Sequence, residues 1–165
     1  MSEYSREELE EMMNRWLAVN NKAEQEGNWR HLADFYTENV IYGWDTPNGK
    51  YEFNDREIVR ETCVGAAMDP YQGWTYPYDK IVIDETKGEV FATWWQTPPG
   101  APVREDGTPM KVIGASWFKY GGNYLWSEQL DMYDYTNITN LIKECVDKGI
   151  LKEMPLMSSQ QVRED

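Results

Sequence analysis

Three stretches with hydrophobic residues at helical spacing precede most of the predicted sheet. The first begins at Leu9 and includes Trp16, and Gly27 stands where a glycine ends a helix. Asn28 caps a second, shorter helix, and Asn54 opens a third with a capping-box-like sequence. Each stretch is apolar on one side only, so we expect all three helices to pack against a core.

The remaining pattern is that of strands joined by short turns. The predicted strands cover residues 39–45, 50–53, 74–83, 89–97, 110–120 and 123–135. Residues 137–148 follow as a last amphipathic helix. Consecutive hairpins favour antiparallel pairing. Helices followed by a long sheet predict an α+β fold, in which a strongly curved antiparallel or mixed sheet wraps the N-terminal helices as a cone and leaves a cavity.

The length of the chain fits one domain. At 165 residues it can close a core around a cavity but is short for two domains. We expect a single domain over residues 1–150. Residues 151–165 lack a hydrophobic period, so we expect a C-terminal tail that is either a lid or disordered.

Charge excludes several partners. The 29 acidic and 16 basic residues give a formal net charge of -13, which repels a phosphate backbone, so nucleic acid is not expected as a partner. No apolar stretch is long enough to span a bilayer, and the N-terminus lacks an apolar signal segment. We therefore expect a cytoplasmic protein without membrane contacts.

Cysteine and histidine content limits the chemistry. Cys63 and Cys145 lack CxxC spacing, so buried, reduced thiols are expected. The single histidine, His31, cannot build a histidine-rich metal site and points away from the apolar stripe of its helix. Since phosphate-binding glycine motifs are also absent, we expect neither a metal nor another cofactor.

The last predicted strand carries the first candidate for catalysis. Its even positions are Tyr124, Trp126, Glu128, Leu130 and Met132. If they share one face, Glu128 is the only acid on an otherwise apolar surface. A carboxyl group surrounded by aromatic rings is suited to act as a general base or acid near neutral pH. Alternatively, Glu128 pairs with a buried donor, or the strand has the opposite phase and Glu128 faces solvent.

Alternation on other strands predicts polar groups in an aromatic wall. Tyr42 shares a strand face with Trp44, and Gln96 with Trp94. Tyr42 can donate to a developing oxyanion, and Gln96 can orient a substrate oxygen, although Tyr42 also fits an ordinary core position. Asn20 lies on the apolar stripe of the first helix, where a buried amide needs a partner or a ligand. The expected substrate-binding residues are Trp16, Asn20, Trp44, Trp94, Gln96, Met110, Val112 and Trp126.

Aromatic residues are more numerous than one small core needs. The chain has 8 Trp and 11 Tyr, and flat rings favour flat apolar ligands. We therefore expect a hydrophobic aromatic small molecule as the ligand. Some rings must lie on the outer face of the sheet, so we also expect a homodimer through that face.

Residues 27–40, 54–59 and 126–131 resemble the nuclear-transport-factor-two-like superfamily and, within it, the bacterial SnoaL-like proteins. The resemblance covers nearly the whole domain and implies a cone-shaped, cystatin-like α+β barrel that is commonly dimeric. That fold hosts dehydratases, ketosteroid isomerases, polyketide cyclases, epoxide hydrolases, formaldehyde-eliminating lyases of lignin-derived dimers and non-enzymatic binders. The resemblance alone does not specify the reaction.

Site residues of these relatives match the chain only in part. Limonene-epoxide-hydrolase-like members carry an Arg and an Asp where this chain has Trp94 and Gln96, and a second Asp at Glu128. Ketosteroid isomerases place their base near Trp44 and a tyrosine near Asn20, so that pattern also fails. Scytalone-dehydratase-like members use histidines that this chain cannot supply.

The resemblance leaves cofactor-free acid/base elimination as the leading hypothesis, a lyase that releases water or formaldehyde with Glu128 and Tyr42. The first alternative is a non-catalytic binding protein with the same pocket. An isomerase or epoxide hydrolase of the same fold and a structural dimerisation domain with a filled core are the others.

Overall fold

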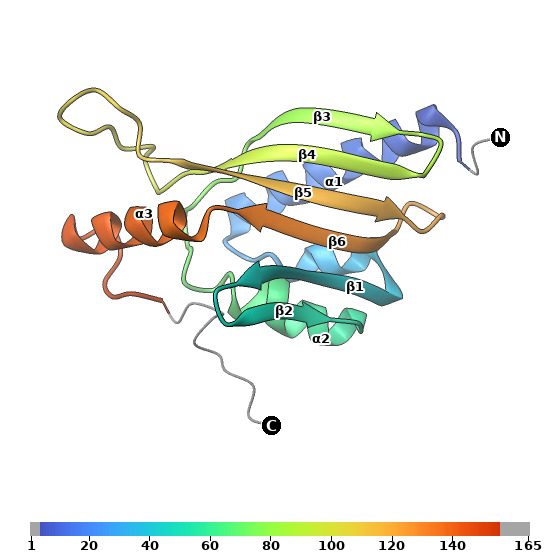
Figure 1. Ribbon diagram of the computed structural model, residues 1–165, viewed down its shortest axis with the longest axis horizontal. Helices are drawn as coiled ribbons and strands as arrows, with labels where there is room; N and C mark the ends of the chain where they lie inside the picture. Colours follow the sequence, from blue (N-terminus) through green and yellow to red (C-terminus); the bar gives the residue numbers. More distant parts are fainter. Residues whose placement is uncertain (1–3, 156–165) are drawn as a thin grey trace.

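The computed structural model describes residues 4–155, which form a curved six-stranded sheet with helices on one face (Figure 1). The helices are α1 (Arg6–Glu26), the short 3-10 helix η1 (Arg30–Phe35), α2 (Arg56–Glu61), the π-helical turn η2 (Thr62–Ala66) and α3 (Tyr135–Asp147). The strands are β1 (Tyr36–Thr46), β2 (Gly49–Phe53), β3 (Tyr78–Asp84), β4 (Glu89–Gln96), β5 (Val112–Tyr120) and β6 (Trp126–Tyr133).

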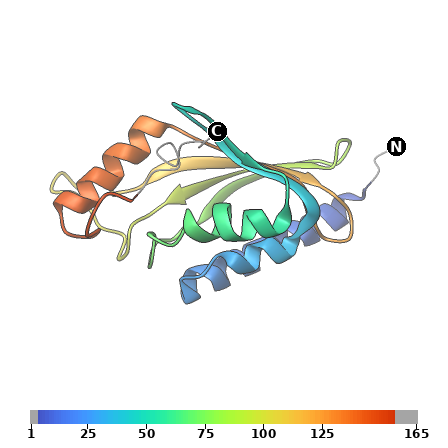
Figure 2. The ribbon, with the colours of Figure 1, turned by 90° about the horizontal axis from the view of Figure 1, so that it is seen from below.

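The sheet has the strand order β2-β1-β6-β5-β4-β3. All neighbours pair antiparallel except β1 and β6, which are parallel. Figure 2 shows the sheet curving over α1 and α2, with α3 beyond one end of the sheet. The predicted α+β class with a curved, mixed sheet is confirmed.

Local sequence explains the ends of α1. The hydroxyl of Ser5 accepts a hydrogen bond from the backbone N–H of Glu8, which satisfies one of the unpaired amides of the first turn. Gly27 ends the helix in the left-handed conformation, with φ at 64°. One face of α1 is buried against the sheet, and there Trp16 packs edge-on against Phe118 at 5.5 Å between ring centroids.

Several predicted boundaries moved, among them that of the strand expected at 74–83, which begins at Tyr78, and two changes near β1 affect the site. The helix expected to begin at Asn54 is capped by Asp55 instead, whose carboxylate accepts from the backbone N–H groups of Glu57 and Ile58. The strand expected to begin at residue 39 begins at Tyr36, because the preceding helix η1 is a short 3-10 helix that ends at Phe35. Both shifts are small, but the second puts the fully buried Tyr36 ring in the sheet, where it reaches the cavity wall described below.

Two further expectations concern membrane-spanning helices and the C-terminal tail. No helix within residues 4–155 is long and apolar enough to cross a bilayer. Of the predicted tail, residues 151–155 are described, and 156–165 lie outside the described residues.

The face of the sheet opposite α1 carries exposed apolar side chains. Phe91 on β4, Trp117 on β5 and Leu130 on β6 are register neighbours, so they form a row across three strands. Phe91 and Met132 each expose 39% of their surface, and Ile113 exposes 49%. Contiguous apolar surface of this kind marks interaction sites. The homodimer through this face stays a prediction.

If the homodimer forms, Phe91→Arg should convert it to a monomer, because burying an unpaired guanidinium costs several kcal/mol. Sedimentation velocity at micromolar protein measures the change. Val103→Arg is the matched control, since Val103 is an apolar loop residue that is 61% exposed. A wild-type protein that sediments as a monomer at all concentrations would contradict the expectation.

Candidate functional site

An aromatic cavity lies between the concave face of the sheet and the segments α1, η1 and η2. Its volume is about 150 Å³. The lining residues are Trp16, Asn20, Trp29, Leu32, Tyr42, Trp44, Cys63, Val64, Ala67, Met68, Tyr71, Tyr76, Tyr78, Trp94, Gln96, Ser116, Gln129, Asp131, Tyr133 and Ile138. Nine of these are aromatic and one is acidic, and none is Lys, Arg or His.

Asp131 on β6 is the acidic residue of the cavity wall, and three neutral groups donate hydrogen bonds to its carboxylate. The Ser116 hydroxyl donates to Oδ1 at 2.6 Å, and the Gln129 amide donates to the same oxygen at 2.9 Å. The Tyr42 hydroxyl donates to Oδ2 at 2.7 Å. Since a carboxylate accepts about four hydrogen bonds, Oδ2 retains the accepting capacity that a ligand can use.

A second set of contacts orients those donors. The Trp94 indole Nε1 donates to the Ser116 hydroxyl at 2.9 Å. The Tyr36 hydroxyl donates to the Gln129 Oε1 at 2.5 Å, which leaves the NH₂ group of Gln129 for Asp131. Both ordering groups are buried side chains of the sheet. The hydrogen-bond geometry around Asp131 is therefore set in advance of ligand binding.

Gly114 makes room for the Trp94 ring. A Cβ atom at position 114 would lie 2.2 Å from Cη2 of Trp94, so a side chain there cannot coexist with the ring. Because Trp94 and Gly114 are register partners on β4 and β5, the indole crosses the neighbouring strand directly above this glycine. That position brings Nε1 within reach of Ser116.

Burial determines the protonation behaviour of the site. It raises the pKa of Asp131 above its ordinary value, and the hydrogen bonds from Gln129, Ser116 and Tyr42 oppose that rise. Burial also raises the pKa of Tyr42 well above its usual value, with the charge of Asp131 adding to the effect. Tyr42 therefore stays a neutral donor near neutral pH, while Asp131 is a stronger base than an exposed aspartate.

Glu128 was predicted to be the acid of the apolar face, and that placement is wrong. It lies on the outer side of the sheet, where its carboxylate is 3.5 Å from Lys119 Nζ and its side chain is 33% exposed. The register explains the error, because Tyr120 pairs with Trp126 whereas Lys119 pairs with Glu128. This bulge adds one residue to β6 and reverses the alternation after Trp126.

The alternation after the bulge offered a signal that the sequence argument missed. Gln129, Asp131 and Tyr133 occupy every second position and all line the cavity. They are polar, whereas Leu130 and Met132 between them are apolar and lie on the outer face. A strand that borders a cavity with functional groups turns polar residues inward. Taking the more hydrophobic face of β6 as the inward face therefore gave the wrong orientation for Glu128.

Six of the predicted residues line the cavity, namely Trp16, Asn20, Tyr42, Trp44, Trp94 and Gln96. The Asn20 amide donates to the backbone oxygen of Trp16 at 2.8 Å, which leaves its own Oδ1 as an acceptor. Gln96 is 7% exposed, and its side-chain amide makes no hydrogen bond to the described residues. Contact of these six residues with a substrate stays a prediction.

Three other predicted residues do not line the cavity. Trp126 is fully buried and stacks on Phe118 at 4.8 Å between centroids, because it precedes the bulge and points into the core. Met110 belongs to a separate apolar cluster that anchors α3, and Val112 packs against the same cluster. Their predicted role in substrate binding is therefore not supported.

The remaining predicted groups have structural positions. His31 lies at the surface with Nε2 3.4 Å from the Glu26 carboxylate. Cys63 and Cys145 are free and buried, and Cys63 forms part of the cavity wall. Burial raises the pKa of the Cys63 thiol to about 12, so it is unreactive near neutral pH. Within residues 4–155, no three His, Cys, Asp or Glu side chains converge as a metal site.

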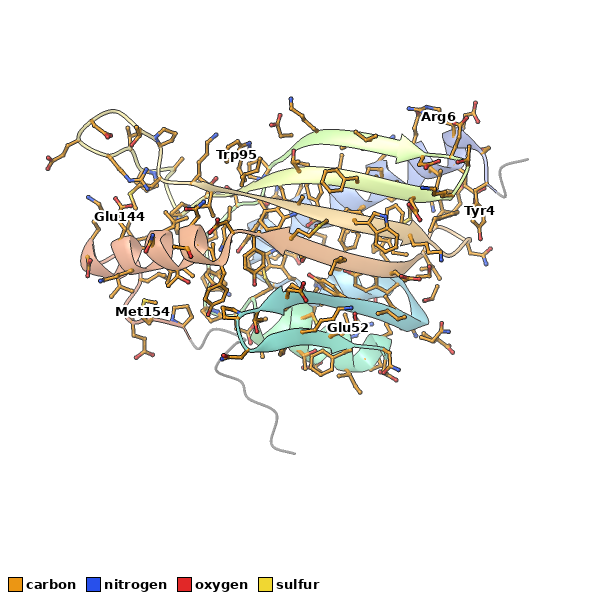
Figure 3. All side chains as sticks on the ribbon, in the orientation of Figure 1. Tyr4, Arg6, Glu52, Trp95, Glu144 and Met154 are labelled. Atoms are coloured by element: carbon orange, nitrogen blue, oxygen red, sulfur yellow. The ribbon has the colours of Figure 1, made fainter. Side chains whose placement is uncertain are left out.

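A second groove lies at the junction of α3 with the sheet, where Figure 3 labels Glu144 and Trp95. Arg104 makes a bidentate ion pair with Glu144 at 2.8 to 3.0 Å. The Lys111 ammonium lies 4.0 Å from the centroid of the Trp95 ring. The Arg104–Glu144 pair joins the loop before β5 to α3, so this groove includes a contact that fixes α3.

The Trp94–Gly114 contact leads to a test of the site's architecture. Gly114→Ala should displace the Trp94 ring and break its bond to Ser116, with a loss of about 1–3 kcal/mol in the free energy of unfolding, as is usual for overpacking. Urea denaturation measures the loss, and tryptophan fluorescence reports the displaced ring. Unchanged stability together with an unchanged emission spectrum would show that Trp94 does not lie on this glycine.

Comparisons with known proteins identify the fold. No family model matches the chain, and no curated protein matches it. Solved structures do match, among them an NTF2-like protein from Anabaena variabilis, with a TM-score of 0.61, 14% identity and coverage of 81% of this chain and 95% of that one.

Two further structures have the same fold. A protein assigned as a SnoaL-like polyketide cyclase from Shewanella putrefaciens aligns with a TM-score of 0.59 and 12% identity, over 86% of this chain and 88% of that one. The epoxide hydrolase/cyclase-like enzyme SalBIII, which acts in pyran ring formation in the polyether salinomycin, aligns with a TM-score of 0.57 and 15% identity, over 83% and 97%. The chain therefore has the cystatin-like fold of the NTF2-like superfamily, to which the SnoaL-like proteins belong.

Proposed function

We propose that this protein is a cofactor-independent lyase that uses Asp131 as a general base on an aromatic or polycyclic small molecule. One observation carries the proposal. The Asp131 carboxylate borders an aromatic cavity, burial raises its pKa, and its described donors are all neutral. An enzyme needs a base whose pKa is raised towards the working pH, and this environment provides it.

The hydrogen bonds favour one oxygen of Asp131 as the reacting atom. Oδ1 already accepts from Ser116 and Gln129, whereas Oδ2 accepts only from Tyr42. Oδ2 is therefore the atom that takes a proton from the substrate. Tyr42, bonded to that same oxygen, is the nearest donor for the oxygen atom that leaves.

Loss of water follows from these two groups. Oδ2 of Asp131 removes a proton from a carbon next to a carbonyl or aryl group, and the electron pair of that C–H bond forms a C=C bond. The neighbouring C–O bond breaks, and the leaving oxygen takes the phenolic proton of Tyr42. Tyr42 then recovers a proton from Asp131, so water is released and both residues return to their starting states.

Loss of formaldehyde uses the same base on a hydroxymethyl substrate. Oδ2 removes the hydroxyl proton, the oxygen electrons form the C=O bond of formaldehyde, and the C–C bond breaks. The carbanion then takes the proton back from Asp131. An aryl group next to that carbon would stabilise the carbanion, and the aromatic walls at Trp44 and Trp94 suit such a group.

Enzymes of this fold support acid/base chemistry only in general terms. SalBIII acts in pyran ring formation, and the Shewanella protein is assigned as a polyketide cyclase. At 12–15% identity these similarities do not specify the reaction here.

A non-catalytic binding protein is the second candidate. Three donors already stabilise the ionised form of Asp131, as expected for a group that fixes a ligand rather than exchanges protons. Turnover separates the two candidates, since a binding protein leaves every compound unchanged.

Asp131→Asn should lower the rate of elimination at least about 100-fold, because an amide cannot accept the substrate proton. Mass spectrometry of phenolic dimers and hydroxy-ketones measures loss of water or formaldehyde. Glu128→Gln removes one carboxylate from the same strand on the opposite face, so it serves as the matched control and should react like wild type. Equal losses in the two variants, or retained activity in Asp131→Asn, would contradict the assignment.

The pH dependence tests Tyr42. Activity should rise with pH as Asp131 loses its proton, with a midpoint above the ordinary aspartate pKa of 3.8. Tyr42→Phe removes a hydrogen bond that lowers the Asp131 pKa, so the rise should move to higher pH, and the maximal rate should fall about 100-fold for lack of the acid. Steady-state rates between pH 4 and 9 show both effects. A lower rate with an unmoved midpoint would mean that Tyr42 does not bond to the base.

A further inference from the structure

Among residues 4–155, no basic side chain lines the cavity beside the Asp131 carboxylate. Its hydrogen-bond donors are Tyr42, Ser116 and Gln129, all of them neutral. None of the described lining residues is Lys, Arg or His. A carboxylate that burial partly desolvates is costly to ionise without a counter-charge, so the cavity favours a ligand that supplies one.

Aromatic rings extend from the carboxylate in two directions. On β1, the Tyr42 ring that bonds Asp131 lies 5.8 Å from the Trp44 ring. On the other side Trp94 reaches Asp131 through Ser116, and the Tyr76 ring lies 5.9 Å from Trp94. Indole and phenol rings attract cations over their faces within about 6 Å of the centroid. The cavity thus has both components of an ammonium site, a carboxylate and a wall of electron-rich rings.

We propose that the ligand of this cavity is an organic cation, an aromatic amine derivative in its ammonium form whose charged nitrogen lies between Asp131 and the rings of Tyr42 and Trp94. The inference rests on the site of the proposed function and names its substrate class. It is also compatible with catalysis, because a positive charge near the reacting carbon makes its C–H bond more acidic.

Other groups of the molecule favour the same ligand class. The Asn20 Oδ1 and the Gln96 amide line the cavity and offer acceptors to ligand N–H or O–H groups. The Glu24 carboxylate accepts from the Tyr76 backbone N–H at 2.6 Å and places a second acid behind the aromatic wall. The net charge of -13 also attracts cations to the protein. An anionic ligand would be repelled by the carboxylates of Asp131 and Glu24 and by the net negative charge of the protein.

A pair of isosteric probes tests the charge alone. Benzyltrimethylammonium and neopentylbenzene have the same shape, but only the first is charged. Tryptophan fluorescence titration at pH 7.5 should give at least about tenfold tighter binding of the ammonium probe to wild type, as expected for desolvated cation–π contacts with a carboxylate nearby. The preference should fall to about parity in Asp131→Asn and persist in Glu128→Gln. Equal or tighter binding of neopentylbenzene to wild type would overturn the inference. So would an equal loss of the preference for the ammonium probe in Asp131→Asn and Glu128→Gln.

A measurement on wild type alone covers the case in which Asp131→Asn fails to fold. Affinity for the permanently charged probe should decrease as pH falls and Asp131 becomes protonated, whereas affinity for the neutral probe should not. Tyr36, Tyr42, Tyr78 and Cys63 also lie near Asp131, and burial raises the pKa of each, so they remain neutral over this range. Burial also raises the pKa of Glu24 behind the Tyr76 ring, so Glu24→Gln is the control variant and should keep the pH dependence. A charged probe whose affinity does not change with pH would contradict the pairing.

The two proposals fail separately. If neutral compounds are converted in an Asp131-dependent reaction but the ammonium probe does not bind preferentially, the substrate class is wrong and the lyase stands. If the ammonium probe binds preferentially but no amine or neutral compound is converted, the cation site stands and the lyase does not.

Discussion

The Asp131 carboxylate, partly buried at the cavity wall and stabilised by hydrogen bonds from neutral groups, is the constraint on which the rest of the site depends. Each of its donors comes from a different part of the sheet, with Tyr42 on β1, Ser116 on β5 and Gln129 on β6 itself. The parallel pairing of β1 with β6 is what brings Tyr42 to the carboxylate, since the two strands are far apart in the chain. A different strand order would leave a buried charge without its hydrogen bonds, at a cost of several kcal/mol.

The sheet also explains why the cavity remains open. Trp94 lies flat over Gly114 and bonds Ser116, so its large ring forms a wall instead of filling the interior. The bulge in β6 turns Asp131 inward and Glu128 outward. The bulge in β6 and the glycine at position 114 thus create the polar end of an otherwise aromatic pocket. The same two features position the proposed base.

Much of the architecture was predictable from local pattern. Capping residues and apolar spacing predicted α1 and its end at Gly27, and alternation placed Tyr42 and Gln96 in the cavity wall. The carboxylate proposed as the base was not found in this way, because the bulge between Trp126 and Glu128 depends on pairing with Tyr120 and Lys119. Its only trace in the sequence is the polar alternation of Gln129, Asp131 and Tyr133 after the bulge. The parallel pairing of β1 and β6 could not be predicted from local pattern either, since it joins strands that are far apart in the sequence.

The central claim is that Asp131 is a buried, cation-seeking carboxylate, and its titration tests this most directly. Carbon-13 NMR of the side-chain carboxyl groups, with the Asp131 signal assigned by its loss in Asp131→Asn, would follow the group through a pH series with and without benzyltrimethylammonium. The account predicts a pKa above the ordinary value of 3.8 in the free protein and a lower pKa once the cation is bound, since the cation favours the ionised form. A free-protein pKa at or below 3.8 that the cation leaves unchanged would contradict it.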